Sequence, residues 1–132
     1  MELMGANKRS ESSIDPRLAS RILEAVPYNN AFYFCTNIGQ YSGESAVSLA
    51  DFCKKITTID VRSVNFHFKR MDFEEWIKGT LGDLYLANEI SKINRSIQGE
   101  DLRTKIYQLV DARLTELKKV LASEEAHLTG TV

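Results

Sequence analysis

The stretch SVNFHFKRMDF, residues 63–73, decides whether this chain is wholly helical or mixed. Apolar and polar side chains alternate from Val64 to Phe68, which is typical of a strand. Val61, Val64 and Phe68 are also spaced as on one face of a helix, and Asp60 stands where a helix cap would be. The periodicity alone leaves both interpretations open. Because the flanking segments are helical and a lone strand has no partner, we predict a helix.

The segments after this stretch carry strong helix signals. Asp72 with Glu75 indicates a capped helix start, and Gly82 indicates the end of that helix. Asp83 is expected to cap the next one. The last helix is expected from about residue 100 to about residue 122, because its apolar side chains fall on one broad face. They are Leu102, Ile106, Leu109, Val110, Leu114, Leu117, Val120 and Leu121.

The segments before this stretch are less uniform. Asp15 followed by Pro16 predicts a helix start, and Ser48 is expected to cap a second helix. Between them, residues 31–35 (AFYFC) have the composition of a strand, and we expect them to be extended although no partner strand is evident. Residues 39–45 (GQYSGES) have the composition of a loop.

The composition fits one domain with its own core. The chain has 132 residues, of which 43% are hydrophobic and 27% charged, and this length suffices for a stable core. We predict an all-α fold, a compact bundle of about five or six helices with a long C-terminal helix and a short extended segment near residues 31–35. Residues 1–13 are expected to form a disordered arm, residues 14–122 the helical domain, and residues 123–132 a flexible tail.

The charge balance argues against nucleic acids and membranes as partners. Seventeen Lys and Arg residues face eighteen Asp and Glu residues, which gives a net charge of −1. A free nucleic-acid ligand and a membrane surface are therefore not expected, because both attract an excess of basic charge. The sequence also predicts neither a signal peptide nor a membrane span. Cys35 and Cys53 are interpreted as free thiols, so we predict a cytoplasmic protein without a metal or cofactor.

One cluster could carry chemistry, namely His67, Arg70, Asp72 and Trp76. A general base needs a histidine that a carboxylate orients, and Asp72 or Glu75 could orient His67. A small-ligand or enzymatic site here is one hypothesis. The favoured interpretation is a buried, hydrogen-bonded histidine that ties two helices together. No catalytic residue is therefore assigned, and an enzyme is not the favoured class.

Two further surfaces could bind partners. The last helix has more apolar positions than one face of a small bundle needs, so Leu114, Leu117 and Leu121 are a candidate interface for a protein partner or a second copy. Docking on a nucleoprotein assembly is a further alternative. It would use basic residues near the central stretch, namely Lys54, Lys55, Arg62, Lys69, Arg70 and Lys78.

Segments between residues 31 and 93 carry a resemblance to a known family. They are Ala31-Phe32-Tyr33-Phe34, Gly39, Gly43-Glu44-Ser45-Ala46, Ser48-Leu49, Phe52, Ser63, Phe66-His67, Arg70, Asp72-Phe73, Trp76-Ile77, Gly82-Asp83, Leu86-Ala87 and Ile90. In these segments the chain resembles an uncharacterised family of small, mainly archaeal helical domains, found alone or attached to other domains, including glycosyltransferase-type enzymes. The resemblance implies a helical fold and no activity. A glycine follows the arginine in that family, whereas this chain has Met71, which speaks against a tight turn there.

These observations favour a non-enzymatic protein-interaction or regulatory module of unknown partner, with a homodimer as one form. The cluster around His67 and the nucleoprotein docking role remain the alternatives. The solvent exposure of the His67 cluster distinguishes the interaction module from a functional site at this cluster. A functional site requires these side chains to line an accessible pocket, whereas an interaction module allows them to be locked inside a helix junction.

Overall fold

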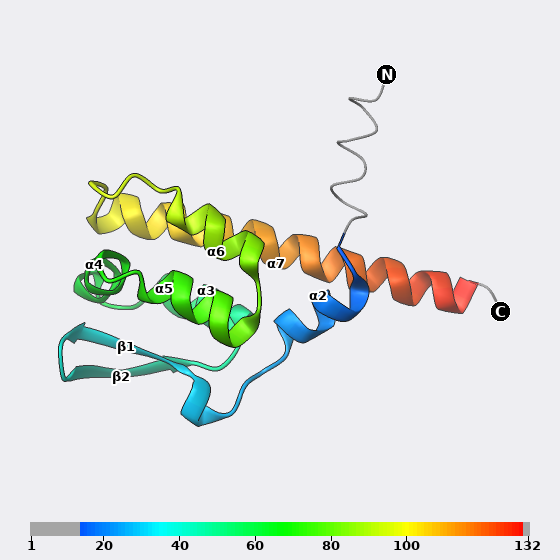
Figure 1. Ribbon diagram of the computed structural model, residues 1–132, viewed down its shortest axis with the longest axis horizontal. Coiled ribbons are helices and arrows are strands. Elements are labelled where there is room, and N and C mark those ends of the chain that lie inside the picture. Colours follow the sequence, from blue (N-terminus) through cyan, green and yellow to red (C-terminus); the bar gives the residue numbers. More distant parts are fainter. Residues whose placement is uncertain (1–13, 131–132) are drawn as a thin grey trace, which may run out of the picture.

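The computed structural model describes the backbone of residues 14–130 and the side chains of residues 14–125. Helices dominate, but a two-stranded antiparallel hairpin packs against them (Figure 1). The elements in chain order are α2 (Pro16–Leu23), the 3-10 turn η1 (Tyr28–Asn30), β1 (Phe32–Asn37), β2 (Gln40–Ala46), α3 (Leu49–Ile56), α4 (Val61–Lys69), α5 (Asp72–Trp76), the π-helical turn η2 (Ile77–Leu81), α6 (Leu84–Ser91) and α7 (Gly99–Gly130). The prediction of an all-α bundle is therefore wrong. The arm expected at residues 1–13 lies outside the described residues.

The hairpin explains why the all-α prediction failed. The segment expected to be extended is β1, and its partner β2 is formed by residues that we assigned to a loop. Gly39 forms the turn at φ 72°, and Gly43 lies at φ 91° where the strand register shifts. Both glycines adopt left-handed backbone that other residues avoid. The loop-like composition thus encodes a turn and a bulge, and β2 is polar because most of it is exposed.

The helix starts follow the capping signals of the sequence. Asp15, Ser48, Asp60 and Asp83 each accept a hydrogen bond from a backbone amide of the first turn, at 2.8–3.1 Å. Residues 61–69 form α4, so the helical interpretation of the central stretch is confirmed. The cap expected at Asp72 is wrong, because Met71 occupies that position and the Asp72 carboxylate turns elsewhere.

Met71 forms a tight turn between α4 and α5, contrary to expectation. Its backbone lies at φ 64° and ψ 24°, in the left-handed region, where a Cβ atom costs about 1–2 kcal/mol. We expect Met71→Gly to raise the free energy of unfolding by about 0.5–1 kcal/mol, because the side chain is 45% exposed and little packing is lost. Urea unfolding measures the change. Met71→Ala keeps the Cβ atom and should not stabilise; equal stabilisation by both variants would contradict the explanation.

The long helix α7 organises the core. It contacts α2, α3, α4 and α6, and its C-terminal part projects beyond them (Figure 1). It runs from Gly99 to Gly130, so it continues past residue 122, where we expected it to end. The largest fully buried side chains join α7 to the hairpin and the short helices; they include Phe34, Phe52, Phe73, Leu102, Ile106 and Leu117. Within residues 14–130 we find no helix with the length and apolar character of a membrane span.

Candidate functional site

His67 joins three elements of the fold through its imidazole ring. From α4, its Nε2 accepts a hydrogen bond from the Cys35 amide of β1 at 2.8 Å. Its Nδ1 lies 2.8 Å from Oδ2 of Asp72 in α5. Because Nε2 is an acceptor, the proton of the neutral ring sits on Nδ1 and is donated to Asp72. Arg70 Nε lies 3.3 Å from the same oxygen, so Asp72 holds His67 and Arg70 together.

The surroundings of His67 favour its neutral form. Burial lowers the pKa of this imidazole, and the charge of Arg70 lowers it further. The hydrogen bond and the charge of Asp72 raise the pKa, but the sum of these effects is a pKa below the ordinary value. Three phenylalanine rings from β1 and α5 surround the imidazole, and their centroids lie 4.7–6.3 Å from its centroid. They belong to Phe32, Phe34 and Phe73. Charging His67 is therefore unfavourable in the folded protein.

This lowered pKa predicts a dependence of stability on pH. The unfolded chain protonates His67 near pH 6.5, whereas the folded protein does so only at lower pH. The stabilisation is therefore complete above about pH 6.5 and is lost as the pH falls through the folded-state value. Urea unfolding at pH values from about 5 to about 8, in steps of about 0.5, measures how the free energy of unfolding changes with pH. His67→Gln keeps an acceptor and a donor without titrating, so its slope should be flatter. Identical slopes in the two proteins would rule out His67 as the cause.

Trp76 does not meet the other three cluster residues directly. It is 8% exposed, and its Nε1 donates to the Asn30 carbonyl at 2.8 Å. Phe32 lies between the two groups, with its ring 4.7 Å from His67 and 5.7 Å from Trp76. The structure thus brings His67, Arg70 and Asp72 together and places Trp76 in the aromatic core.

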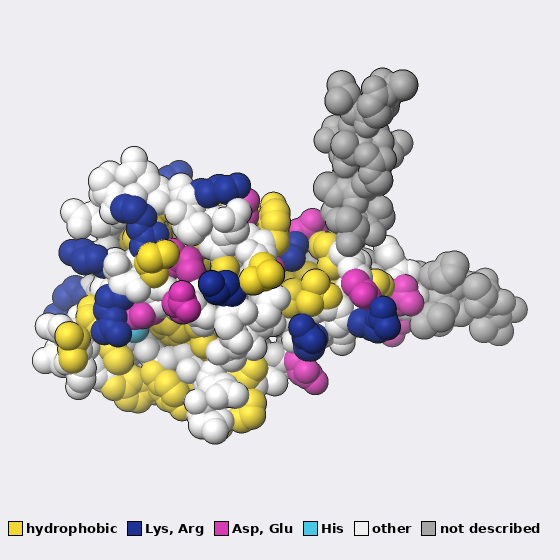
Figure 2. Space-filling model, in the orientation of Figure 1, with side chains coloured by type: hydrophobic (Ala, Val, Ile, Leu, Met, Phe, Trp, Pro, Cys, Tyr) yellow, Lys and Arg dark blue, Asp and Glu magenta, His cyan; other side chains and the backbone are white. Residues whose placement is uncertain are grey.

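An apolar and charged groove, which the sequence analysis missed, lies between α2 and α6 with α7 as its floor. Its cavity has a volume of about 690 Å³. Figure 2 shows hydrophobic, acidic and basic side chains interspersed in this part of the molecule. The lining residues are Ile14, Pro16, Tyr85, Leu86, Glu89, Leu109, Ala112, Arg113, Thr115, Glu116, Lys119, Val120, Ser123 and Glu124. A smaller cavity of about 380 Å³ lies between the end of α6 and α7. Neither cavity is lined by the His67 cluster.

A buried ion pair connects α7 to the start of α6 beneath the groove. Arg113 of α7 donates two hydrogen bonds to Asp83, at 2.8 and 2.9 Å, and a third to Glu116 at 2.9 Å. Burial lowers the pKa of this guanidinium, but Asp83 and Glu116 more than offset that effect and raise it overall. The ring of Tyr85, which is 55% exposed, lies 4.6 Å from the guanidinium carbon. One wall and the floor of the groove are therefore held rigidly together.

Comparison with known proteins places the chain in a family. A family of unknown function, DUF5752, matches residues 28–129. This chain belongs to the DUF5752 family. The match extends from the first turn of the hairpin region through most of α7, so it includes the His67 cluster and most of the groove. No curated protein and no solved structure matches the chain.

The interface predicted on the last helix of this DUF5752 domain is mostly occupied by the core. Leu117 is fully buried, Leu114 is 6% exposed, and Leu121 is partly buried against the same core. The number of apolar positions on this helix suggested an interface, whereas the structure packs these leucines in or against the hydrophobic core. The free face of α7 is a different one. Leu109, Ala112, Glu116, Lys119 and Ser123 line the groove at alternating spacings of three and four, and this pattern was readable in the sequence.

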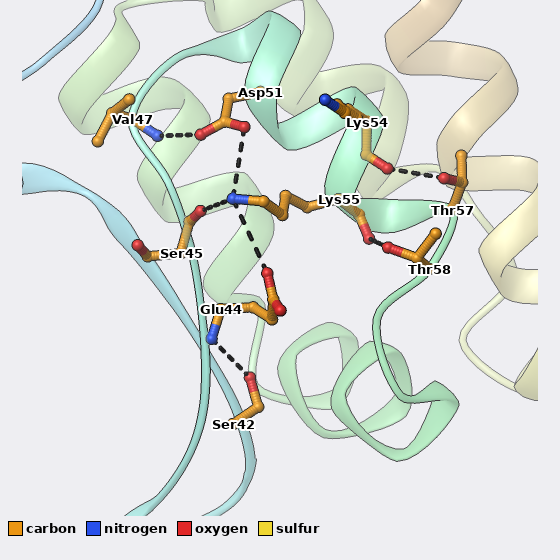
Figure 3. Close-up of polar contacts among 9 residues, drawn as sticks. All are labelled: Ser42, Glu44, Ser45, Val47, Asp51, Lys54, Lys55, Thr57 and Thr58. Atoms are coloured by element: carbon orange, nitrogen blue, oxygen red, sulfur yellow. Dashed lines mark hydrogen bonds and ion pairs between the residues drawn. The ribbon is translucent and has the colours of Figure 1, made fainter.

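Several basic residues near the central stretch are held by carboxylates. Lys55 of α3 lies 3.4 Å from Asp51 and 3.9 Å from Glu44, and it also donates to the Ser45 carbonyl (Figure 3). Asp51 in turn accepts from the Val47 amide, so this cluster fastens β2 to α3 in the DUF5752 domain. Arg62 pairs with Asp60, and Arg70 pairs with Asp72. Among residues 14–125, no group of three or more metal-ligating side chains is placed to hold a metal ion.

Proposed function

We propose that the protein is a non-enzymatic protein-interaction module that binds an amphipathic helix in the α2–α6 groove. The observation that carries the proposal is the groove itself, which is large and in which apolar side chains, such as those of Ile14, Leu86 and Leu109, are interspersed with charged ones. Grooves of this kind recognise a helix through apolar side chains spaced three and four apart. The stretch of α7 from Leu109 to Glu124 spans about 22 Å at 1.5 Å per residue, which matches about four turns of a bound helix.

The charges of the groove specify the polar edge of the bound helix. Glu89, Glu116 and Glu124 lie along it with Lys119, while Arg113 is neutralised by Asp83. An amphipathic helix with a lysine or arginine opposite Glu116 therefore complements the groove. Glu116 is already oriented by Arg113 and remains 33% exposed at its side chain, so it can accept a second cation.

The geometry of the His67 cluster argues against the enzymatic alternative. Both ring nitrogens are engaged, one by the Cys35 amide and one by Asp72, and the side chain is 6% exposed. A general base needs a free nitrogen within reach of a substrate. The nucleoprotein alternative draws on basic residues of which Lys55, Arg62 and Arg70 are paired with carboxylates. Neither alternative has the support that the groove gives to helix binding.

A labelled peptide tests this function. The probe is a designed helix of about 18 residues with leucine and alanine at the three-four spacing and lysines along one edge. We expect saturable binding by fluorescence anisotropy at low protein concentration. Ala112→Arg, at the exposed floor of the groove, should weaken it at least about tenfold, or about 1.4 kcal/mol. Ala122→Arg adds the same charge at an exposed position of α7 outside the groove lining and should bind normally. Equal binding by both variants would reject the groove.

Attachment to other domains, including glycosyltransferase-type enzymes, and occurrence mainly in archaea are what the sequence resemblance implies. Both remain predictions, as do a regulatory role and a cytoplasmic location. A helix-binding groove suits such a module, since it would let the domain hold a partner without contributing chemistry.

A further inference from the structure

We infer that the helix bound in the groove is α7 of a second copy of this chain, packed antiparallel to the first. This inference rests on the proposed function and names the partner of the same groove. It requires that α7 present a second seam besides the one buried in the core, that the seam complement itself, and that only one direction of packing satisfy its charges.

The second seam is formed by Leu109, Ala112, Glu116, Lys119 and Ser123, all of which line the groove. Their spacing of three, four, three and four places them in one row along the helix, as in the seven-residue repeat of paired helices. Only Leu109 and Ala112 in this row are apolar, so the pairing argument depends on its charges and small side chains. The buried core residues are centred about 120° around α7 from this seam, at about 100° per residue. They therefore form a neighbouring face, and Leu109 borders both. The C-terminal part of α7 projects beyond the other helices (Figure 1).

The seam complements itself when a two-fold axis passes midway between Glu116 and Lys119. Glu116 then faces Lys119 of the second copy, and the same pair repeats across the axis. Ala112 faces Ser123 of the second copy, also twice. Ala112, Lys119 and Ser123 are exposed. The small side chains of Ala112 and Ser123 let the two helices approach closely where these residues face each other. Symmetry therefore turns one favourable ion pair into two.

The charges select the antiparallel direction. In a parallel pair in register, Glu116 would face Glu116 and Lys119 would face Lys119, and like charges at such positions are unfavourable. The Glu116 carboxylate is also fixed in place by its 2.9 Å contact with Arg113. The ion pair thus forms on a preorganised acceptor, which reduces the entropy lost on association.

The oligomeric state of the full chain gives the first test. Sedimentation equilibrium should show a monomer–dimer equilibrium. Lys119→Glu should raise the dissociation constant at least about tenfold, because two attractive pairs become repulsive. Adding Glu116→Lys to that variant should restore dimerisation, because the pair is exchanged and kept. A monomer throughout, or a dimer that Lys119→Glu leaves unchanged, would overturn the inference. Thermal melts check that each variant is folded, since Glu116 also contacts Arg113.

Disulfide trapping tests the register even if the Glu116 variant folds poorly. A mixture of Ala112→Cys and Ser123→Cys chains should form a mixed disulfide dimer rapidly under mild oxidation. Neither variant should cross-link with itself quickly, because identical positions would lie about 16 Å apart along the axis. The unsubstituted chain, with Cys35 and Cys53, is the control. Rapid self-linkage of the Ala112→Cys chain would indicate a parallel pair and reject the register.

The two proposals fail in different ways. A chain that stays monomeric yet binds the designed peptide in the groove would overturn the second-copy inference and leave the helix-binding function standing. A monomeric chain whose groove also ignores the peptide would overturn both.

Discussion

Asp83→Ala is expected to lower the free energy of unfolding by about 3–5 kcal/mol, the largest effect of any single charged residue in the fold. The carboxylate is 1% exposed and accepts both hydrogen bonds of the Arg113 fork. Its removal leaves a buried guanidinium without its main counter-charge. The substitution also removes the cap that Asp83 provides to the Leu86 amide at the start of α6. Urea unfolding monitored by circular dichroism measures the loss.

Asp60→Ala is the matched control for this result. Asp60 also caps a helix and pairs with an arginine, Arg62, but both side chains are exposed. Its replacement should therefore destabilise the protein far less. Adding Arg113→Met to Asp83→Ala should recover part of the loss, because no charge then remains buried. Similar losses for Asp60→Ala and Asp83→Ala would show that burial of the ion pair is not the cause.

Phe52→Ala is expected to destabilise the protein by about 3–5 kcal/mol. The ring is fully buried, and its centroid lies 5.4–5.8 Å from four other aromatic rings of β1 and α5. Truncation removes these contacts and leaves a cavity that the hairpin and helices cannot close without moving. Trp76, which stacks on Phe52, is the single tryptophan, so its fluorescence reports unfolding and a local change in packing in the same experiment.

Phe66→Ala controls for the loss of a phenylalanine as such. Phe66 lies on the neighbouring α4 helix but is only partly buried, with the Arg70 guanidinium carbon 4.9 Å from its ring centroid. Its truncation should cost clearly less stability than that of Phe52, and it should leave the Trp76 emission of the folded protein unchanged. Comparable losses for the two variants would contradict an aromatic core centred on Phe52.

Local signals in the sequence were sufficient for most of the helices. Ser48, Asp60 and Asp83 cap the helices that follow them because capping involves only residues two or three positions away. The hairpin escaped prediction because its second strand is exposed and contains Gly43 at a bulge, so it lacks the alternation of a half-buried strand. The turn at Met71 was not expected either, since it needs a backbone conformation that methionine rarely adopts.

The site was predictable only where its partners are near in sequence. Asp72 lies five residues from His67, and it was one of the two carboxylates, with Glu75, that the sequence offered for orienting the imidazole. The Cys35 amide lies 32 residues away on a strand that we could only describe as extended, so nothing in the sequence showed that it would occupy Nε2. Asp83 was expected only as a helix cap, and nothing in the sequence connected it with Arg113. Their ion pair depends on how α6 packs on α7.

The position of α7 in the chain has a consequence for biosynthesis. Five core residues, Leu102, Ile106, Val110, Leu114 and Leu117, lie on this last helix. A nascent chain that has emerged only as far as α6 therefore presents the apolar sides of α2, α3 and α4 without the helix that covers them. The core can therefore be completed only after α7 has been synthesised. Ribosome-bound intermediates of this length should be clients of chaperones that hold exposed apolar surface.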